Sequence, residues 1–211
     1  MDRMKNTGPQ LLMFDVGGVL VNYSQQVHFG KIAKRLDSEC SEVFLRAREF
    51  ARLLDGGKIT VREVERELAL IFDCKFEKTA GIWKEAFEKS VSQNRFVVNV
   101  AQKLARRGHD VVLATNKSVG AYRSLFGRGG VLRSFSGFPI FASCYLGVSK
   151  PDQRYFRLVL QKMNSSPGRA IFIDDNSKNI LSAQSLGIRS IRYSNNDKRL
   201  ARSLARLDID I

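Results

Sequence analysis

The sequence predicts an α/β fold, a doubly wound, Rossmann-like parallel sheet with a helical block inserted after its first strand. Apolar runs at residues 11–14, 111–114 and 170–173 have the length of buried strands, and each ends in polar residues. From residue 97 onward such runs alternate with helical spacing, an order typical of parallel sheets with right-handed crossovers. Between residues 24 and 92 the spacing is helical and strand-like runs are absent, which indicates an insertion.

The first strand ends at a carboxylate. Residues 11–14 are apolar, Asp15 follows, and Gly17 and Gly18 precede the next apolar residues. The two glycines let the backbone bend sharply and come close to a ligand. Because open α/β sheets bind ligands at the carboxyl ends of their strands, Asp15 is a candidate functional residue.

The inserted block is expected to form about four short helices, enough for a small bundle. Ser41 can cap one helix, which a glycine pair beginning at Gly56 ends. Thr60 and the glutamate three residues later have the spacing of a capping box at the next helix. The expected domains are an α/β core of residues 1–22 plus 93–211 and a helical domain of residues 23–92.

The chain after residue 93 supplies the remaining strands and helices of the core. Pro151 suits the first residue of a helix, because its missing N–H is not needed there. Gly187 ends the helix that follows the strand at residues 170–173. We expect helices over residues 100–107, 119–126, 151–163 and 178–186, strands over residues 111–114, 140–143, 170–173 and 188–193, and a surface helix in the last dozen residues.

Composition indicates a cytoplasmic protein. No apolar run approaches the roughly 18 residues that a membrane span needs, and no signal-peptide core follows the polar first residues. Cys40, Cys74 and Cys144 are odd in number and lack metal-ligand spacing, which is typical of reduced thiols. We expect no membrane contact, and a monomer or a homodimer.

The net charge of +14 is concentrated in one part of the chain. Residues 95–133 hold eight basic side chains against Asp110 alone, whereas residues 24–92 are nearly neutral. Such a field favours anionic partners, either a phosphorylated metabolite or a nucleic acid. Simple solubility is the favoured explanation, since the sequence does not show these charges on one face.

The polar residues at the strand ends suit phosphoryl transfer. Asp15 can attack phosphorus and form an acyl phosphate. Magnesium prefers oxygen ligands, which the carboxylates of Asp15 and Asp175 and the backbone carbonyl of Gly17 can supply, with Asp174 adjacent. We therefore expect a Mg²⁺ site at this edge of the sheet.

A phosphate group can be bound beside this metal site. Thr115, at the end of the strand at residues 111–114, and the nearby backbone amides can donate to a phosphoryl oxygen. Lys150 can hold the same phosphate and keep Asp15 ionised. Each residue alone also has a structural explanation, such as ending a strand or capping the helix near Ser177. The order of all four sets along the chain favours the functional one.

Four segments resemble the ordered motifs of the haloacid-dehalogenase-like hydrolase superfamily, namely residues 15–19, 115–116, 149–152 and 172–176. The resemblance covers essentially the whole chain, and the helical block is similar to the helical cap domain of that superfamily. The most similar branch contains sugar-phosphate phosphatases of the glucose-1-phosphate phosphatase type and the amino-terminal phosphatase domain of soluble epoxide hydrolase.

The resemblance implies a role for each motif residue. Asp15 would be the nucleophile and a metal ligand, and Asp175 the main second carboxylate, in contact with the metal. Asn179 stands where many relatives have a further acid. The implied set is, for catalysis, Asp15 and Lys150; for phosphate, Thr115, Asn116, Lys150 and Gly17; and for Mg²⁺, Asp15, Gly17, Asp175 and Asp174.

Gly17 departs from the superfamily pattern. Most of its phosphatases have a second aspartate there, which protonates the leaving alcohol and later activates water. The branch named above shares the glycine, so the enzyme need not be inactive. The change removes a general acid, which typically contributes about 10²–10⁴-fold. No residue is assigned to that role.

The sequence therefore predicts a Mg²⁺-dependent phosphatase that acts on a small phosphorylated metabolite, above all a sugar phosphate, through a phosphoaspartyl intermediate on Asp15. A haloacid dehalogenase is one alternative, which the pair Asp174 and Asp175 argues against. A weak or non-catalytic regulator, favoured by Gly17, and a nucleic-acid-directed phosphatase or binder are the others. Candidate substrate contacts in the helical block are Tyr23, Arg46, Arg48 and Trp83, with Trp83 expected in the bundle core and His28 incidental.

Overall fold

The computed structural model describes residues 10–211, and its centre is a five-stranded sheet of parallel strands. The first strand in the chain lies in the middle of the sheet, as the doubly wound order requires. In spatial order the strands are β5 (Ile140–Ala142), β4 (Asp110–Thr115), β1 (Leu11–Phe14), β6 (Ala170–Asp174) and β7 (Arg189–Arg192). The sequence-based prediction of an α/β core is confirmed.

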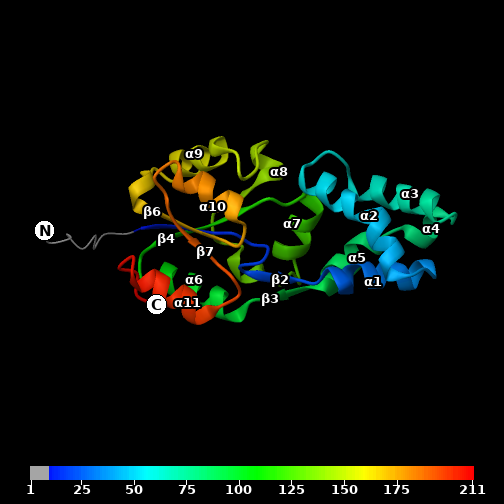
Figure 1. Ribbon diagram of the computed structural model, residues 1–211, viewed down its shortest axis with the longest axis horizontal. Helices are drawn as coiled ribbons and strands as arrows, with labels where there is room; N and C mark the ends of the chain where they lie inside the picture. The colour runs from blue at the N-terminus through cyan, green and yellow to red at the C-terminus, as the bar shows by residue number, and fades with distance from the viewer. Residues whose placement is uncertain (1–9) are drawn as a thin grey trace, which may run out of the picture.

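Helices cover both faces of this sheet (Figure 1). Because side chains alternate along a strand, Leu12 and Phe14 of β1 pack toward one helix layer, and Leu11 and Met13 toward the other. All four are buried. The first layer contains α6 (Arg95–Arg106), α7 (Val119–Phe126) and α11 (Asp197–Ala205), and the second contains α9 (Gln153–Lys162) and α10 (Ser177–Gln184).

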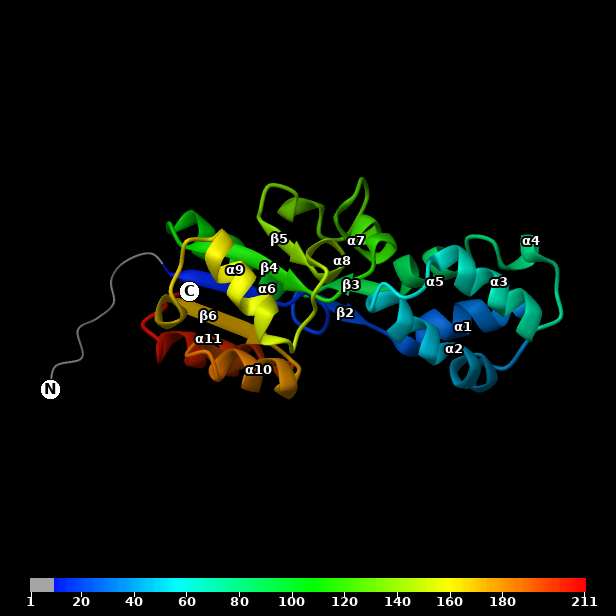
Figure 2. The ribbon, with the colours of Figure 1, turned by 90° about the horizontal axis from the view of Figure 1, so that it is seen from above.

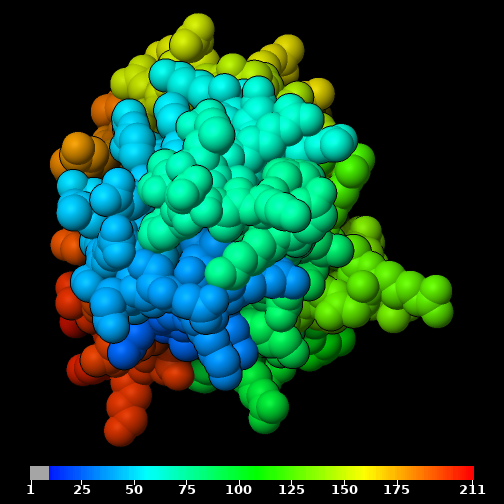
Figure 3. Space-filling model, turned by 90° about the vertical axis from the view of Figure 1, so that its right-hand side faces the viewer, coloured from blue at the N-terminus to red at the C-terminus, as the bar shows by residue number. Residues whose placement is uncertain are grey.

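The segment after β1 forms a separate helical lobe (Figure 2). Its helices share a hydrophobic core of their own, which includes Phe29, Leu68 and Trp83. A short antiparallel pair, β2 (Val21–Tyr23) and β3 (Val91–Gln93), joins the two lobes. Seen from its own end, the helical lobe covers the sheet lobe behind it (Figure 3). The helices are α1 (Gln25–Leu36), α2 (Cys40–Asp55), α3 (Val61–Ile71), α4 (Phe76–Thr79) and α5 (Ile82–Ser90).

Helix capping explains where several of these elements begin. The capping box is confirmed, because the Thr60 hydroxyl accepts from the Glu63 amide while the Glu63 carboxylate accepts from the Thr60 amide. The prediction for Ser41 is wrong, since α2 begins at Cys40 with Glu39 in the cap position. Ser41 therefore lies inside the helix.

Two further predictions need correction. Helix α9 begins at Gln153, because the Asp152 carboxylate accepts from the Arg154 amide and caps it; Pro151 precedes the helix. Strand β3 begins at Val91, within the segment expected to lack strands. Three short helices complete the chain: α8 (Ser143–Leu146) and the 3₁₀ turns Arg133–Phe135 and Pro167–Arg169.

No helix within residues 10–211 is both long and apolar enough to cross a membrane.

Candidate active site

The register of the three central strands brings the predicted site residues together. Phe14 of β1 pairs with Leu113 of β4 and with Ile173 of β6. Parallel strands in register end at the same edge of the sheet. Asp15, Thr115 and Asp174 therefore lie side by side, and all three are buried.

The Lys150 ammonium bridges the carboxylates of Asp15 and Asp174 at this edge. It donates to Asp15 Oδ1 at 2.8 Å, to Asp174 Oδ2 at 2.7 Å and to the Ala114 carbonyl oxygen at 2.8 Å. The residue is 4 % exposed. An ammonium group has three protons, so these three acceptors engage all of them.

In this cluster, burial and the neighbouring opposite charges shift the pKa values in opposite directions. Burial raises the pKa of Asp15 to about 6, although the Lys150 ammonium acts to lower it. For Lys150, burial acts to lower the pKa, but the carboxylates of Asp15 and Asp174 outweigh it and the pKa is raised. At neutral pH Asp15 is thus a carboxylate that has little hydration, a state that suits a nucleophile.

Asn116 holds the backbone of Lys150. Its side-chain amide donates to the Lys150 carbonyl at 2.7 Å, and its Oδ1 accepts from the Lys150 amide at 2.9 Å. The sequence predicts that Asn116 is one of the residues that bind phosphate. The structure shows the side-chain amide of Asn116 in contact with the backbone of Lys150.

The Thr115 hydroxyl is a buried donor beside the cavity that has no partner in the described residues. It is fully buried, and Oγ1 has no hydrogen-bond partner among residues 10–211. Thr115 also lines the cavity beside Asp15. Because a buried polar group without a partner costs free energy, this hydroxyl is a ready donor to a bound oxygen atom.

Three carboxylates offer a site for a hard cation. Asp15, Asp174 and Asp175 each place one oxygen so that the three lie within 4.8 Å of one another. Mg²⁺ prefers such oxygen ligands, so the residues fit the ion that the sequence predicts. The Asp174 carboxylate is engaged by Lys150, by Asn179 at 3.0 Å and by the Asn176 amide at 2.7 Å.

Gly18 makes room for Asp175. Gly18 has a φ of +76°, and a Cβ atom built on it would overlap the Asp175 carboxylate. Glycine is thus favoured at this position for two reasons: the positive φ of its backbone and the close approach of the Asp175 carboxylate. The second glycine of the motif shapes the cation site.

Gly18→Ala is expected to weaken Mg²⁺ binding about 10–100-fold, because the new methyl group displaces the Asp175 carboxylate. Isothermal titration calorimetry with Mg²⁺ measures the change. Gly108→Ala is the matched control, since Gly108 has a φ of +85° with open space around its Cβ position. Equal Mg²⁺ affinity in the two variants would contradict the assignment.

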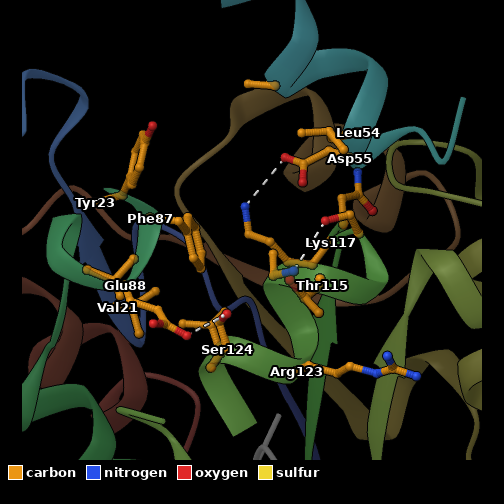
Figure 4. Close-up of a pocket in the computed structure, with 18 of the residues that line it drawn as sticks. Val21, Tyr23, Leu54, Asp55, Phe87, Glu88, Thr115, Lys117, Arg123 and Ser124 are labelled. Carbon is orange, nitrogen blue, oxygen red and sulfur yellow. Dashed lines mark hydrogen bonds and ion pairs between the residues drawn. The ribbon is translucent and has the colours of Figure 1, made fainter. Parts of the chain in front are cut away.

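A cavity of about 940 Å³ opens above these residues and extends to the helical lobe. Aromatic side chains form part of its wall, as Figure 4 shows for Tyr23 and Phe87. Trp83 and His28 continue that wall, with ring centroids 4.7 Å apart. Burial lowers the pKa of His28 to about 4, so His28 is a neutral part of the wall rather than an incidental residue.

The expected substrate contacts of the helical lobe divide into two pairs. Tyr23 and Trp83 line the cavity, and Trp83 also belongs to the core of that lobe. Arg46 and Arg48 lie on α2 away from the cavity lining, and Arg46 pairs with Glu42 at 3.2 Å. The structure does not bring these two arginines to the site.

The sequence analysis did not single out Lys117 and Asp55, which both line the cavity. Lys117 lies two residues beyond Thr115, and Asp55 lies at the end of α2; their side chains face each other across the cavity with Nζ and Oδ2 3.5 Å apart (Figure 4). The position of Lys117 just after a strand-end motif is a usable signal. Asp55 has no comparable signal, because only the packing of the lobes brings it there.

The basic stretch does not form one continuous lining of the cavity. Of its eight basic residues, Lys117, Arg123 and Arg128 line the cavity. The other five lie outside that lining, four of them on or just after α6 and one in the 3₁₀ turn that begins at Arg133.

A doubly wound sheet with clustered carboxylates and a buried lysine at its carboxyl edge defines a class of α/β enzymes. The profile of the haloacid dehalogenase-like hydrolases matches residues 9–187. The chain belongs to this family of hydrolases, which confirms the resemblance inferred from the four motifs.

The relatives include a phosphatase, a cyclase and an epoxide hydrolase. The sesquiterpene phosphatase of Aspergillus oryzae is 25 % identical over 83 % of this chain and 85 % of its own length. The drimenol cyclase of Aspergillus calidoustus is 28 % identical over 89 % of this chain, but the match spans only 34 % of that protein. The pig bifunctional epoxide hydrolase 2 matches 56 % of this chain at 24 % identity.

Solved structures share the fold. A predicted haloacid-dehalogenase-like hydrolase from Porphyromonas gingivalis superimposes with a TM-score of 0.74 at 21 % identity, covering 96 % of this chain and 99 % of its own. An enzyme of the same family from Bacteroides thetaiotaomicron, in complex with magnesium and inorganic phosphate, gives 0.72 at 20 % identity, covering 89 % and 95 %.

Proposed function

We propose that this protein is a Mg²⁺-dependent phosphatase that acts through a phosphoaspartyl intermediate on Asp15. The observation that carries the proposal is that Asp15, Asp175 and the unpaired Thr115 hydroxyl line one cavity. Together with Asp174, the two carboxylates could hold a cation there. The phosphatase among the relatives and the magnesium–phosphate complex of a structural neighbour support it.

The residues present divide the reaction between them. The Asp15 carboxylate attacks phosphorus in line with the leaving oxygen, and water later hydrolyses the acyl phosphate. Thr115 donates to a phosphoryl oxygen, while Lys150 keeps Asp15 ionised and in place. Asp15, Asp175 and the Gly17 carbonyl would hold Mg²⁺, with Asp174 behind them. When bound, the ion supplies positive charge against the phosphoryl oxygens.

The substrate is a small phosphorylated metabolite. A sugar phosphate stays the prediction from the sequence resemblance. The aromatic wall of Tyr23, Trp83 and Phe87, with Val21 and Leu54 also in the lining, favours a second candidate, a phosphate ester of an apolar alcohol. The sesquiterpene phosphatase among the relatives supports this second class.

A dehalogenase or a nucleic-acid-directed protein is less well supported. Dehalogenation at carbon does not need the cation site that Asp15, Asp174 and Asp175 form. A nucleic-acid binder needs a continuous basic track into the cleft, and five of the eight basic residues of the stretch lie outside the cavity lining.

The test is phosphate release from a panel of sugar phosphates, nucleotides, prenyl phosphates and nitrophenyl phosphate. We expect release when Mg²⁺ is present, and we expect a chelator to abolish it. The preferred ester distinguishes the two substrate classes. Turnover that persists in chelator would contradict the Mg²⁺-dependent mechanism. A folded protein without phosphate release from any of these compounds would contradict the phosphatase.

A further inference from the structure

We propose that Lys117, oriented by Asp55 of the helical lobe, donates the proton that the leaving oxygen needs. The proposal rests on the phosphatase function proposed above and names the proton donor of that reaction. An alkoxide is a poor leaving group, so a phosphatase that accepts alkyl esters needs a proton donor beside Asp15.

The Lys117 ammonium lies near Gly17 and takes no part in the cluster around Lys150. Gly17, two residues after Asp15, has no side chain, and a Cβ atom built on it would lie 3.6 Å from Lys117 Nζ. Lys117 follows β4 at the sheet edge and lines the same cavity as Asp15 and Thr115. Its ammonium thus lies where a longer residue at position 17 would point.

Four other residues that line the cavity are less suitable as proton donors. The three protons of Lys150 are engaged by Asp15, Asp174 and the Ala114 carbonyl. Both ring nitrogens of His28 are buried among aromatic rings. Arg123 and Arg128 line the cavity, but a guanidinium does not give up its proton in a protein.

Asp55 orients Lys117 from the opposite lobe. Its Oδ2 lies 3.5 Å from Lys117 Nζ, and the Lys117 side chain is 21 % exposed (Figure 4). Because Asp55 ends α2 and Lys117 follows β4, their ion pair crosses the cavity between the lobes. The position of the proton donor therefore depends on how the helical lobe lies over the sheet.

The proton balance closes over the two steps. As the Asp15 oxygen bonds to phosphorus, the bond from phosphorus to the leaving oxygen breaks, and that oxygen takes a proton from the Lys117 ammonium. The alcohol leaves, and Lys117 is a neutral amine. Water then attacks the phosphoaspartyl group and gives its proton to Lys117, while the bond from phosphorus to Asp15 breaks. Phosphate leaves with Asp15 and Lys117 in their starting forms.

Dependence on the leaving group tests this role. Lys117→Met is expected to lower kcat/KM, which reports the step that releases the alcohol, about 10²–10⁴-fold for an alkyl phosphate. The same variant is expected to lower kcat/KM less than about threefold for nitrophenyl phosphate, whose phenolate leaves without a proton. Gly17→Asp combined with Lys117→Met is expected to recover part of the alkyl phosphate turnover. Asp55→Asn is expected to give a smaller loss with the same selectivity.

The controls separate this proposal from the phosphatase itself. Asp15-dependent turnover of nitrophenyl phosphate by the unmodified protein establishes the phosphatase whatever Lys117 does, and its absence overturns both proposals. Lys89→Met changes an exposed lysine outside the cavity lining. This variant is expected to leave kcat/KM unchanged for both substrates. Equal losses of kcat/KM for both esters in Lys117→Met, or no loss for either, would overturn the proton-donor role alone.

Discussion

Asp15→Asn is expected to lower kcat for every phosphate ester by about 10⁴-fold or more, because an amide oxygen does not form the covalent intermediate. The fold should persist, since the remaining oxygen can still accept from Lys150, which also keeps its contact with Asp174. Steady-state kinetics at saturating Mg²⁺, with thermal unfolding measured in parallel, tests the expectation.

Asp73→Asn is the matched control, because it makes the same chemical change at an exposed residue in the turn after α3. Asparagine tolerates the positive φ that Asp73 adopts there. Activity in this control should equal that of the unmodified protein. An Asp15→Asn variant with a tenth or more of the original turnover would exclude Asp15 as the nucleophile.

Lys150→Met is expected to destabilise the protein by about 3–5 kcal/mol, because it leaves buried carboxylates without their cation. Asp174 is fully buried and Asp15 is 8 % exposed, so neither gains much water when the ammonium is removed. Activity should be lost as well, since protonation of Asp15 then removes the nucleophile. Urea unfolding without Mg²⁺ measures the change in the free energy of unfolding.

A double-mutant cycle separates the charge effect from a packing effect. Asp174→Asn removes one of the two carboxylates. Lys150→Met should therefore lower the free energy of unfolding less in that variant than in the unmodified protein. Lys178→Met, at an exposed lysine on α10, should change the free energy of unfolding by no more than about 0.5 kcal/mol. Additive effects of the changes at 150 and 174 would refute the buried ion pair as the source of the stability.

Much of the site was predictable because strand ends and short motifs are local features. Asp15, Thr115 and Asp174 each end an apolar run, and the rules for parallel sheets place such ends at one edge. The capping box at Thr60 depends on residues three apart and was equally accessible. Pro151 shows the limit, because the competing cap at Asp152 moved the start of α9.

The roles of Asn116 and Lys117 were less predictable, because both depend on side-chain orientation. The sequence marks Asn116 as a neighbour of Thr115, but only the loop carrying Lys150 shows that its amide holds that backbone. The position of Lys117 beside Gly17 depends on the loop after β4. Neither orientation follows from the spacing of residues.

The parallel sheet, the helical insertion and the set of carboxylates, hydroxyl and lysine at the strand ends could all be predicted from the order of residues. These follow from apolar periodicity and from residue type, which are properties of short segments. Which atoms contact one another could be seen only in the folded chain. Examples are the three acceptors of Lys150, the aromatic wall and the contact of Asp55 with Lys117. Such contacts depend on how separate segments pack, because residues 62 positions apart are brought within 3.5 Å by the fold and not by the chain.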